Sequence, residues 1–197
     1  MTLPKILTKS WDDAMPSTAT APEVLAQDRH LRYRLDVIAS DVAALVQAAG
    51  GWLYHRVAIG WDVTVMVPPE RDPRPLQILG VHTADLETGL SAPGETSGHG
   101  LAVVADPFVA DPRIRQRVQL ALRHSLTEVV LWGDSWPAVV NHRLAEVRHV
   151  PTVAGRAFKR QALLAAEVTD AQIDSPERFY SDQMSCLPGD SDLVPVG

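Results

Sequence analysis

The chain cannot form an internal disulfide, because it contains a single cysteine, Cys186. Aromatic residues make up only 6% of the sequence although hydrophobic residues make up 46%, so aliphatic side chains must build most of the core. No stretch approaches the roughly 20 apolar residues of a membrane-spanning helix. The N-terminal segment MTLPKILTKSWDDAM also lacks the long apolar run of a signal peptide. We therefore expect a cytoplasmic protein that does not bind membranes.

Positive charge is scarce as well, since the formal net charge is −6. The acidic residues concentrate near the C-terminus, where residues 170–197 hold six carboxylates and one arginine, Arg178. Proteins that bind nucleic acid through its charge need an excess of lysine and arginine to contact the phosphates. We therefore expect no nucleic-acid partner.

The signatures of common cofactor sites are missing too. The sequence contains neither G-x-G-x-x-G nor G-x-x-x-x-G-K-[ST], so the usual dinucleotide and P-loop sites are not indicated. His-Glu-x-x-His is absent, and the position of the only cysteine near the C-terminus disfavours a cysteine–histidine nucleophile. We expect no cofactor and no metal.

An apolar repeat is the most extended pattern that is present. From Val24 to Trp52, apolar residues recur at alternating spacings of four and three, interrupted only by Asp28. This spacing predicts a long N-terminal helix, which either covers a sheet as an amphipathic helix or forms a coiled-coil seam. In the second case the protein would form a homodimer or bind a protein partner through an interface made of Leu31, Leu35, Ile38, Val42, Leu45 and Trp52.

Several segments show the composition of strands and helices. Runs of aliphatic and β-branched residues predict strands at 61–67, 75–81, 101–105 and 128–132. The first two are separated too briefly for a helical crossover, so we expect an antiparallel hairpin. The last two flank a helix that begins at Asp111-Pro112, which predicts a parallel βαβ unit. Further predictions are a loop over 82–100, helices over 137–147 and 154–168, and a short strand near 148–153.

These elements predict an α/β fold, with helices packed on a mixed sheet of about four or five strands and with the long N-terminal helix at its start. The length of 197 residues suits one domain with extended ends. We expect a flexible arm over residues 1–19, a single α/β domain over 20–169 and an acidic, loosely ordered tail over 170–197.

Gly133-Asp134-Ser135 directly follows the predicted strand 128–132. The three residues resemble the nucleophile block of the GDSL/SGNH hydrolase family, in which a strand ends in a Gly-Asp-Ser turn. This resemblance implies a serine esterase-like hydrolase with Ser135 and Asp134 as catalytic residues. The match covers these three residues, and the family's later Asp-x-x-His pair has no counterpart after Ser135. Helix capping by Asp134 or Ser135 explains the same residues without catalysis.

Ligands of open α/β sheets favour the carboxyl ends of the strands. That edge would gather Asp106 and Gly133, and it would also include His82 and His99 if the predicted 82–100 loop folds over it. A metal-dependent protein that uses His82, Asp85 and His99 is a further alternative, although the paired spacing of known metal sites is missing. A serine hydrolase would need His82, His99 or His142 within hydrogen-bond reach of Ser135.

No single pattern fixes an activity. The apolar seam and the acidic tail favour a noncatalytic binding or regulatory protein that acts through protein–protein contacts. The alternative is the esterase-like hydrolase centred on Ser135.

Overall fold

The computed structural model describes residues 33–91, 99–123, 127–133, 136, 144–182 and 192–196. They lie within one compact unit, Arg32–Gly197. The predicted arm over 1–19 lies outside the described residues, as do Leu31, Asp134, Ser135 and His142. No helix in the described part of the chain is long and apolar enough to span a membrane.

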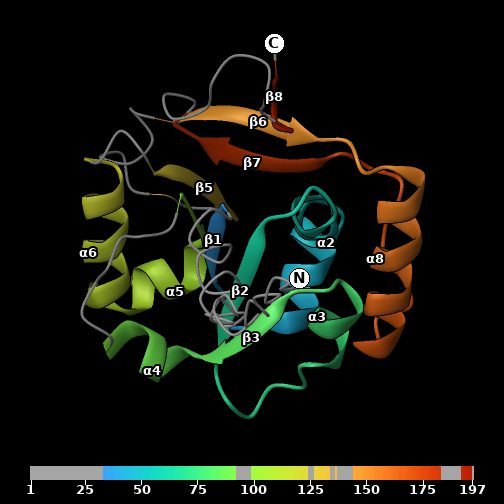
Figure 1. Ribbon diagram of the computed structural model, residues 1–197, viewed down its shortest axis with the longest axis horizontal. Helices are drawn as coiled ribbons and strands as arrows, with labels where there is room; N and C mark the ends of the chain where they lie inside the picture. Colours follow the sequence, from blue (N-terminus) through green and yellow to red (C-terminus); the bar gives the residue numbers. More distant parts are fainter. Residues whose placement is uncertain are drawn as a thin grey trace, which may run out of the picture. The chain divides into compact units, whose positions relative to one another are not determined.

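The described strands form one mixed sheet in the order β3-β2-β1-β4-β5-β7-β6-β8 (Figure 1). Their bounds are β1 (Arg34–Ile38), β2 (Asp62–Val67), β3 (His82–Asp85), β4 (Gly100–Val104), β5 (Glu128–Trp132), β6 (Ala145–His149), β7 (Glu177–Ser181) and β8 (Val194–Pro195). The strands from β3 through β5 run parallel, whereas β7, β6 and β8 are antiparallel to their neighbours. The predicted α/β fold with a mixed sheet is therefore confirmed, but the predicted strand number was too low, because the sheet has 8 strands.

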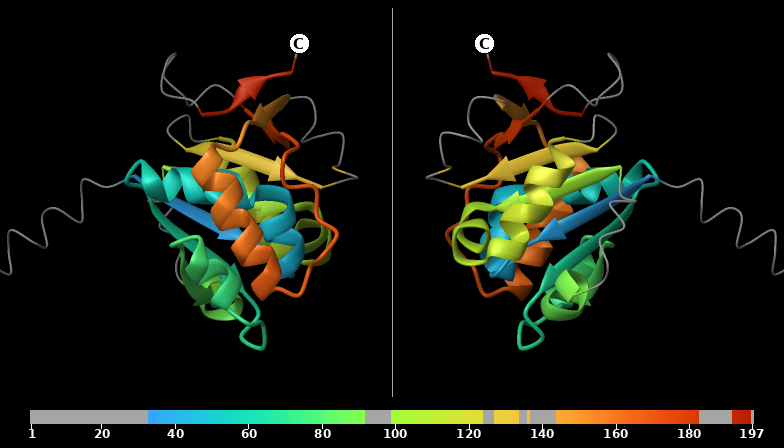
Figure 2. Two further views of the ribbon diagram at one scale, coloured as in Figure 1. Left: turned by 90° about the vertical axis from the view of Figure 1, so that its right-hand side faces the viewer. Right: turned by 90° about the vertical axis from the view of Figure 1, so that its left-hand side faces the viewer.

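The described helices are α2 (Val42–Ala58), α3 (Arg74–Ile78), α4 (Leu86–Ser91), α5 (Ala105–Ala110), α6 (Pro112–Ala121) and α8 (Val153–Ala165). One face of the sheet packs against α2, α3 and α8, and the other packs against α5 and α6 (Figures 1 and 2). Each face has its own hydrophobic cluster, with Leu35 and Val37 on the first and Ile38 and Val103 on the second.

The predicted long N-terminal helix is wrong, because residues 34–38 form β1 and α2 begins only at Val42. Leu35 and Ile38 continue the alternating spacing of four and three that the apolar residues of α2 show. Their apolar segment also fits a buried strand, so the spacing alone could not distinguish a helix from a strand. The overlooked signal is Asp41, whose Oδ1 accepts a 2.8 Å hydrogen bond from the Ala44 amide and caps α2.

The described residues of the predicted interface all lie in the core of the subunit. Their side chains are at most 6% exposed, and they are Leu35, Ile38, Val42, Leu45 and Trp52. Side chains that are this deeply buried fill the space between the sheet and its helices, so they are not available to a partner. The described residues of the seam therefore do not form the predicted partner surface.

The predicted hairpin of 61–67 and 75–81 is wrong in its second half. The first segment is β2, but Arg74–Ile78 forms the short helix α3, and β2 pairs in parallel with β3. Prolines at the first turn of α3 suit a helix start, which explains why this apolar run is not a strand. The predicted loop over 82–100 is likewise corrected, since it contains β3 and α4.

The C-terminal part is also more ordered than predicted. Val147 belongs to β6 and not to the predicted helix over 137–147. The tail that was predicted to be loosely ordered contributes β7 and β8 to the sheet. Phe179 of β7 is fully buried, and Asp192 forms hydrogen bonds of 2.6 and 3.0 Å with the buried Arg56 guanidinium. Arg56 also bonds Glu128 at 3.0 Å. These buried contacts fix the C-terminal segment against α2 and β5.

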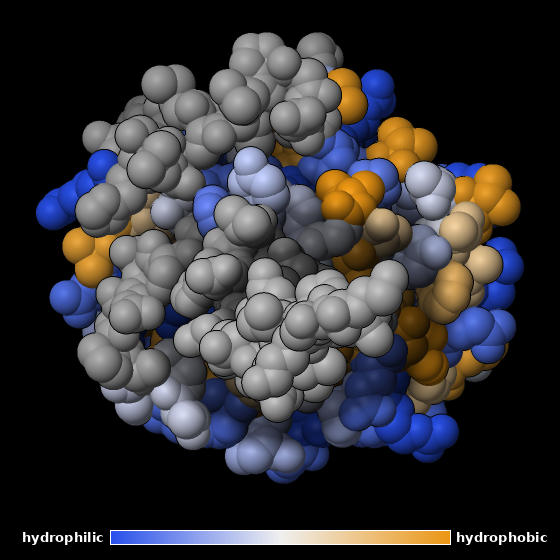
Figure 3. Space-filling view, in the orientation of Figure 1, coloured by the Kyte–Doolittle hydropathy of each residue, from blue (hydrophilic) through white to orange (hydrophobic). Residues whose placement is uncertain are grey.

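The predictions for β2, β4, β5, α6 and α8 are confirmed to within a few residues. On α8, Ala162 and Leu163 pack into the core, whereas Val153, Phe158 and Leu164 are exposed. Apolar side chains accordingly gather on the side of the molecule that α8 forms (Figure 3). Phe158 stacks on Tyr54 of α2 with a centroid distance of 4.5 Å, so part of this apolar surface is covered within the chain.

Candidate active site

The order of the parallel strands reverses between β1 and β4. After β1 the chain continues into α2 on one face, and after β4 it continues into α5 on the other. Ile38 pairs with Val103, so Asp41 and Asp106 each follow one of these strands at the same offset. In open α/β sheets, ligands bind at the carboxyl ends of the strands where the topology switches in this way.

Asp41 lies between the start of α2 and the loop that joins β2 to α3. Its second carboxylate oxygen, Oδ2, is 3.4 Å from the Arg71 guanidinium, and both side chains are nearly half exposed. The Arg71 amide donates to the Pro68 carbonyl at 3.1 Å, which closes a turn in a loop that also contains Pro69 and Pro73. Because proline fixes φ, this loop is stiff and holds the backbone of Arg71 in one place.

Two hollows adjoin Arg71 at this edge. The first has a volume of about 310 Å³ and lies between the start of α2, the β2–α3 loop and the end of α8. The second has a volume of about 200 Å³ and is lined by the ends of β2 and β3, including Thr83 and Asp85. Arg71 lines both, so a ligand in either hollow would lie against the same residue.

The first hollow is also lined by Glu167, which follows α8 with a φ of 59°. A left-handed conformation is unfavourable for a residue other than glycine and costs on the order of 1–3 kcal/mol. Here the conformation belongs to the C-terminal cap of α8, because the amides of Glu167 and Val168 donate to the carbonyls of Leu164 and Leu163 at 3.1 and 2.9 Å. The end of α8 therefore shapes one wall of this hollow.

Asp106 and Gly133 lie at the ends of the adjacent strands β4 and β5. Asp106 is an exposed residue in the first turn of α5. Gly133 has a φ of 100°, and a Cβ at this position would lie 3.1 Å from the Cβ of Ala105. The structure therefore brings Asp106 and Gly133 to one edge. The predicted catalytic residues Asp134 and Ser135 follow Gly133 directly but lie outside the described residues.

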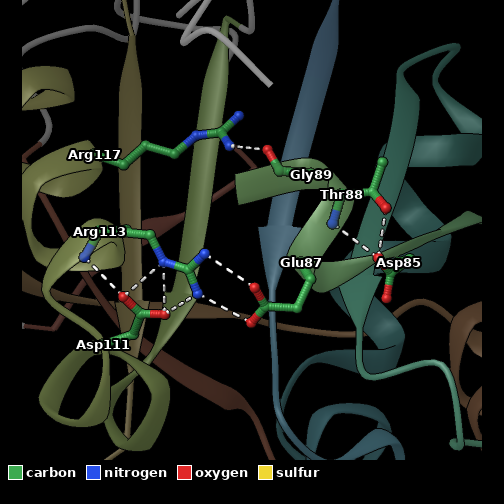
Figure 4. A network of polar contacts seen from close by, with 7 residues as sticks. All are labelled: Asp85, Glu87, Thr88, Gly89, Asp111, Arg113 and Arg117. Carbon is green, nitrogen blue, oxygen red and sulfur yellow. Dashed lines mark hydrogen bonds and ion pairs between the residues drawn. The ribbon is translucent and has the colours of Figure 1, made fainter. Parts of the chain in front are cut away.

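A network of ion pairs borders this edge on the side of α6 (Figure 4). Arg113 donates two hydrogen bonds of 3.0 Å to Glu87 and others to Asp111, which caps α6. The hydrogen bond with the Arg113 side chain is the main reason that the pKa of Asp111 lies below its usual value. The Thr88 hydroxyl lowers the pKa of Asp85 in the same way. Both carboxylates are committed to structural contacts and stay ionised.

His82 and His99 do not reach this edge. His82 is the first residue of β3, and the His99 carbonyl accepts a hydrogen bond from the amide of Glu128, the first residue of β5. Both histidines therefore lie at the amino edge, which a five-residue strand separates from the carboxyl edge by about 16 Å. Neither can act as the base for a serine that follows Gly133.

The three predicted metal ligands, His82, Asp85 and His99, do not come together either. Asp85 lies at the carboxyl end of β3, whereas His82 lies at its amino end. Within the described ranges, no three His, Cys, Asp or Glu side chains come together in a way that could hold a metal ion. The described part of the chain therefore does not fit a metal centre.

The sequence analysis missed Asp41 and Arg71. Asp41 fell inside the helix predicted from the apolar seam, and Arg71 fell inside the turn of the predicted hairpin. The available signals were the capping position of Asp41 before a helical run and the four prolines at 68, 69, 73 and 75, which mark an ordered loop.

No family model and no curated protein matches the sequence. Solved structures share the fold. A deacetylase triple mutant from the teicoplanin biosynthetic pathway matches with a TM-score of 0.51 and 15% identity, over 75% of this chain and 97% of that chain. The zinc-inhibited form of teicoplanin deacetylase matches with a TM-score of 0.53 and 12% identity, over 75% and 97%. The A40926 pseudoaglycone deacetylase matches with a TM-score of 0.51 and 14% identity, over 76% and 96%.

These similarities correct the functional expectation. The sequence favoured a noncatalytic protein that acts through protein–protein contacts, but the solved structures named above, which share the fold, are of deacetylases. The described part of the seam that supported a partner surface is buried core. The noncatalytic interpretation is therefore wrong, and the hydrolase alternative agrees better with the fold.

Proposed function

We propose that this protein is a hydrolase that removes an acyl group from an amide or an ester. The observation that carries the proposal is the fold shared with deacetylases, which cleave bonds of this kind. The carboxyl edge adds a place for the reaction, because it combines the switch point between β1 and β4 with two hollows beside Arg71.

The reaction needs a nucleophile, a base and a group that stabilises negative charge. The nucleophile attacks the acyl carbon, the C–N or C–O bond breaks, and the leaving amine or alcohol takes up a proton. If the nucleophile is water, the acyl group leaves directly as a carboxylate. If it is a serine, the acyl group is first bound to the serine oxygen, and a water molecule then hydrolyses this ester and releases the carboxylate. We assign the base to Asp106, which is exposed and has no hydrogen bond or ion pair within the described residues. We assign charge stabilisation to Arg71, which follows β2 at the same edge of the sheet and lines both hollows, whereas Asp106 lines neither of them.

The nucleophile is either Ser135 or a water molecule. Ser135 comes two residues after Gly133, and Gly133 lies against Ala105, the neighbour of Asp106. We therefore choose Asp106 as the described carboxylate that accepts the proton of the nucleophile. Both routes use Asp106, but only the first requires the serine hydroxyl.

The test is hydrolysis by the purified protein of a panel of N-acyl amines and acyl esters with chains from acetyl to decanoyl, followed by mass spectrometry. We expect release of the carboxylate above the buffer blank. Asp106→Asn should lower the rate by at least about 100-fold, the usual contribution of a general base. Ser135→Ala should do so as well on the serine route and leave most of the rate on the water route.

Asp62→Asn is the matched control, because it removes an exposed carboxylate at the amino edge of the sheet. It should keep the wild-type rate. The proposal fails if no member of the panel is hydrolysed, or if Asp62→Asn loses as much activity as Asp106→Asn.

A further inference from the structure

The helix α4 follows β3 at the carboxyl edge and is weakly embedded in the fold. None of its residues is fully buried. Leu86 and Leu90 pack against the second hydrophobic cluster, but each remains partly exposed. Elements that bury little apolar surface open at a low free energy, well below that of global unfolding.

Polar side chains of α6 hold α4 in place (Figure 4). Arg113 forms a two-pronged ion pair with Glu87, with both hydrogen bonds at 3.0 Å. Arg117 donates to the Gly89 carbonyl at 3.2 Å and to the buried Asp36 carboxylate of β1 at 3.0 Å. Arg117 thus connects α4 to the centre of the sheet, whereas Arg113 connects it only to the start of α6.

The close packing of α4 against β2 involves a glycine. A Cβ at Gly89 would lie 2.5 Å from the sulfur of Met66, a residue of β2. A side chain at position 89 would have to displace either α4 or the flexible end of the Met66 side chain. Glycine lets α4 lie this close to β2 without either shift.

We propose that α4 is a mobile flap beside the second hollow, and that the Arg113–Glu87 ion pair holds it closed against α6. Asp85 is the last residue before α4 and lines this hollow of about 200 Å³. No residue of α4 itself lines the hollow, so movement of α4 would act on it through Asp85. The proposal concerns the motion of α4 and does not depend on which bond the protein cleaves.

The Arg113–Glu87 ion pair is weak enough to break easily. Arg113 is 45% exposed and Glu87 is 68% exposed, so water and salt screen their attraction. Exposed ion pairs of this kind contribute little to stability. The same weakness lets the flap open under conditions that leave the rest of the fold intact.

Hydrogen–deuterium exchange of the peptides that cover residues 86–91 tests the proposal in the intact chain. Arg113→Gln and Glu87→Gln should each speed exchange there by about two- to fivefold, the range expected for an exposed pair. The double variant should exchange no faster than the faster single variant, because both remove the same contact. Salt at 0.5 M should speed exchange in the wild type but not in Arg113→Gln.

The matched control is Arg115→Gln, since Arg115 lies on the same helix but donates to the carbonyls of Phe108 and Val109 and not to α4. It should leave residues 86–91 unchanged. If Arg113→Gln loosens the whole fold, the result for Glu87→Gln decides whether the ion pair holds α4. Within the described chain, the Glu87 side chain forms hydrogen bonds only with Arg113, so this variant removes that contact alone. Unchanged exchange in Glu87→Gln, or an equal rise in Arg115→Gln, would overturn the proposal.

Gly89→Ala provides a second, independent probe. Its Cβ would collide with the sulfur of Met66, so it should speed exchange over 86–91 while Arg113 and Glu87 are both present. If exchange stays at the wild-type rate, the Met66 side chain has moved aside, and the result for Glu87→Gln decides between a mobile and a fixed α4.

Discussion

At the residue scale, the buried carboxylates differ in how well their charge is compensated. Lys159 and Glu177 form a fully buried ion pair of 2.6 Å, and Glu177 also accepts hydrogen bonds from the Gly51 and Trp52 amides of α2. Asp182 has no cationic partner among the described residues. The Val129 amide donates a hydrogen bond to its carboxylate, but its Oδ1 is buried without one in the described structure. Burial, with a smaller contribution from the nearby Glu128, raises the pKa of Asp182 to about 6.

This raised pKa predicts the pH dependence of Asp182→Asn. The ordinary pKa of the group is 3.8, so the folded state disfavours the ionised form and loses stability as the pH rises from about 4 to about 6. The variant should therefore be more stable than the wild type above pH 6, by about 1 kcal/mol once partial exposure is taken into account. Denaturant unfolding at several pH values measures this.

The advantage of Asp182→Asn should shrink as the pH falls below 6 and vanish near pH 4. Glu70→Gln is the control, since it neutralises an exposed acid on the β2–α3 loop and should change stability little at any pH. An equal advantage at pH 4 and pH 8 would show that the charge of Asp182 is not the cause.

At the scale of elements, the packing of α2 against the C-terminal half depends on its two central glycines. A Cβ at Gly51 would lie 2.7 Å from two ring carbons of Pro151, which cannot rotate away. A Cβ at Gly50 would lie 3.1 Å from Cγ of Lys159, a flexible side chain. The two neighbouring glycines therefore meet different kinds of obstacle.

Gly51→Ala should accordingly destabilise the protein by about 1–3 kcal/mol, the usual effect of overpacking. Gly50→Ala should cost less, because the Lys159 stem can shift and alanine favours a helix by about 1 kcal/mol over glycine. Thermal and denaturant unfolding of the two variants compares them directly. A Gly50→Ala variant less stable than Gly51→Ala would contradict the packing described for Pro151.

The elements also show which sequence signals were sufficient. The strands β4 and β5 and the helix α6 were predictable, because continuous apolar runs flank an aspartate–proline helix start. The start of the domain was not, because Leu35 and Ile38 of β1 share a helical spacing with α2. The strand β7 was missed because its alternating buried and exposed residues lie in an acidic, proline-containing segment.

At the scale of the whole molecule, the sequence predicted part of the candidate site. Asp106 and Gly133 were predictable, since both directly follow recognisable strands. Arg71 and Asp41 were not, because their place at the edge depends on the parallel pairing of β1 with β2, which the predicted helix and hairpin concealed. His82 and His99 were misplaced, because a loop prediction cannot tell at which end of a strand a residue lies.

The central claim is that acyl hydrolysis takes place at the carboxyl edge of the sheet. The most direct test compares the rate of carboxylate release from the best acyl substrate for two pairs of variants. Arg71→Gln and Asp106→Asn change the carboxyl edge, and Asp62→Asn and His82→Asn change the amino edge. The account predicts a large loss of rate in the first pair and a rate close to wild type in the second. Equal losses in both pairs, or losses confined to the amino edge, would contradict it.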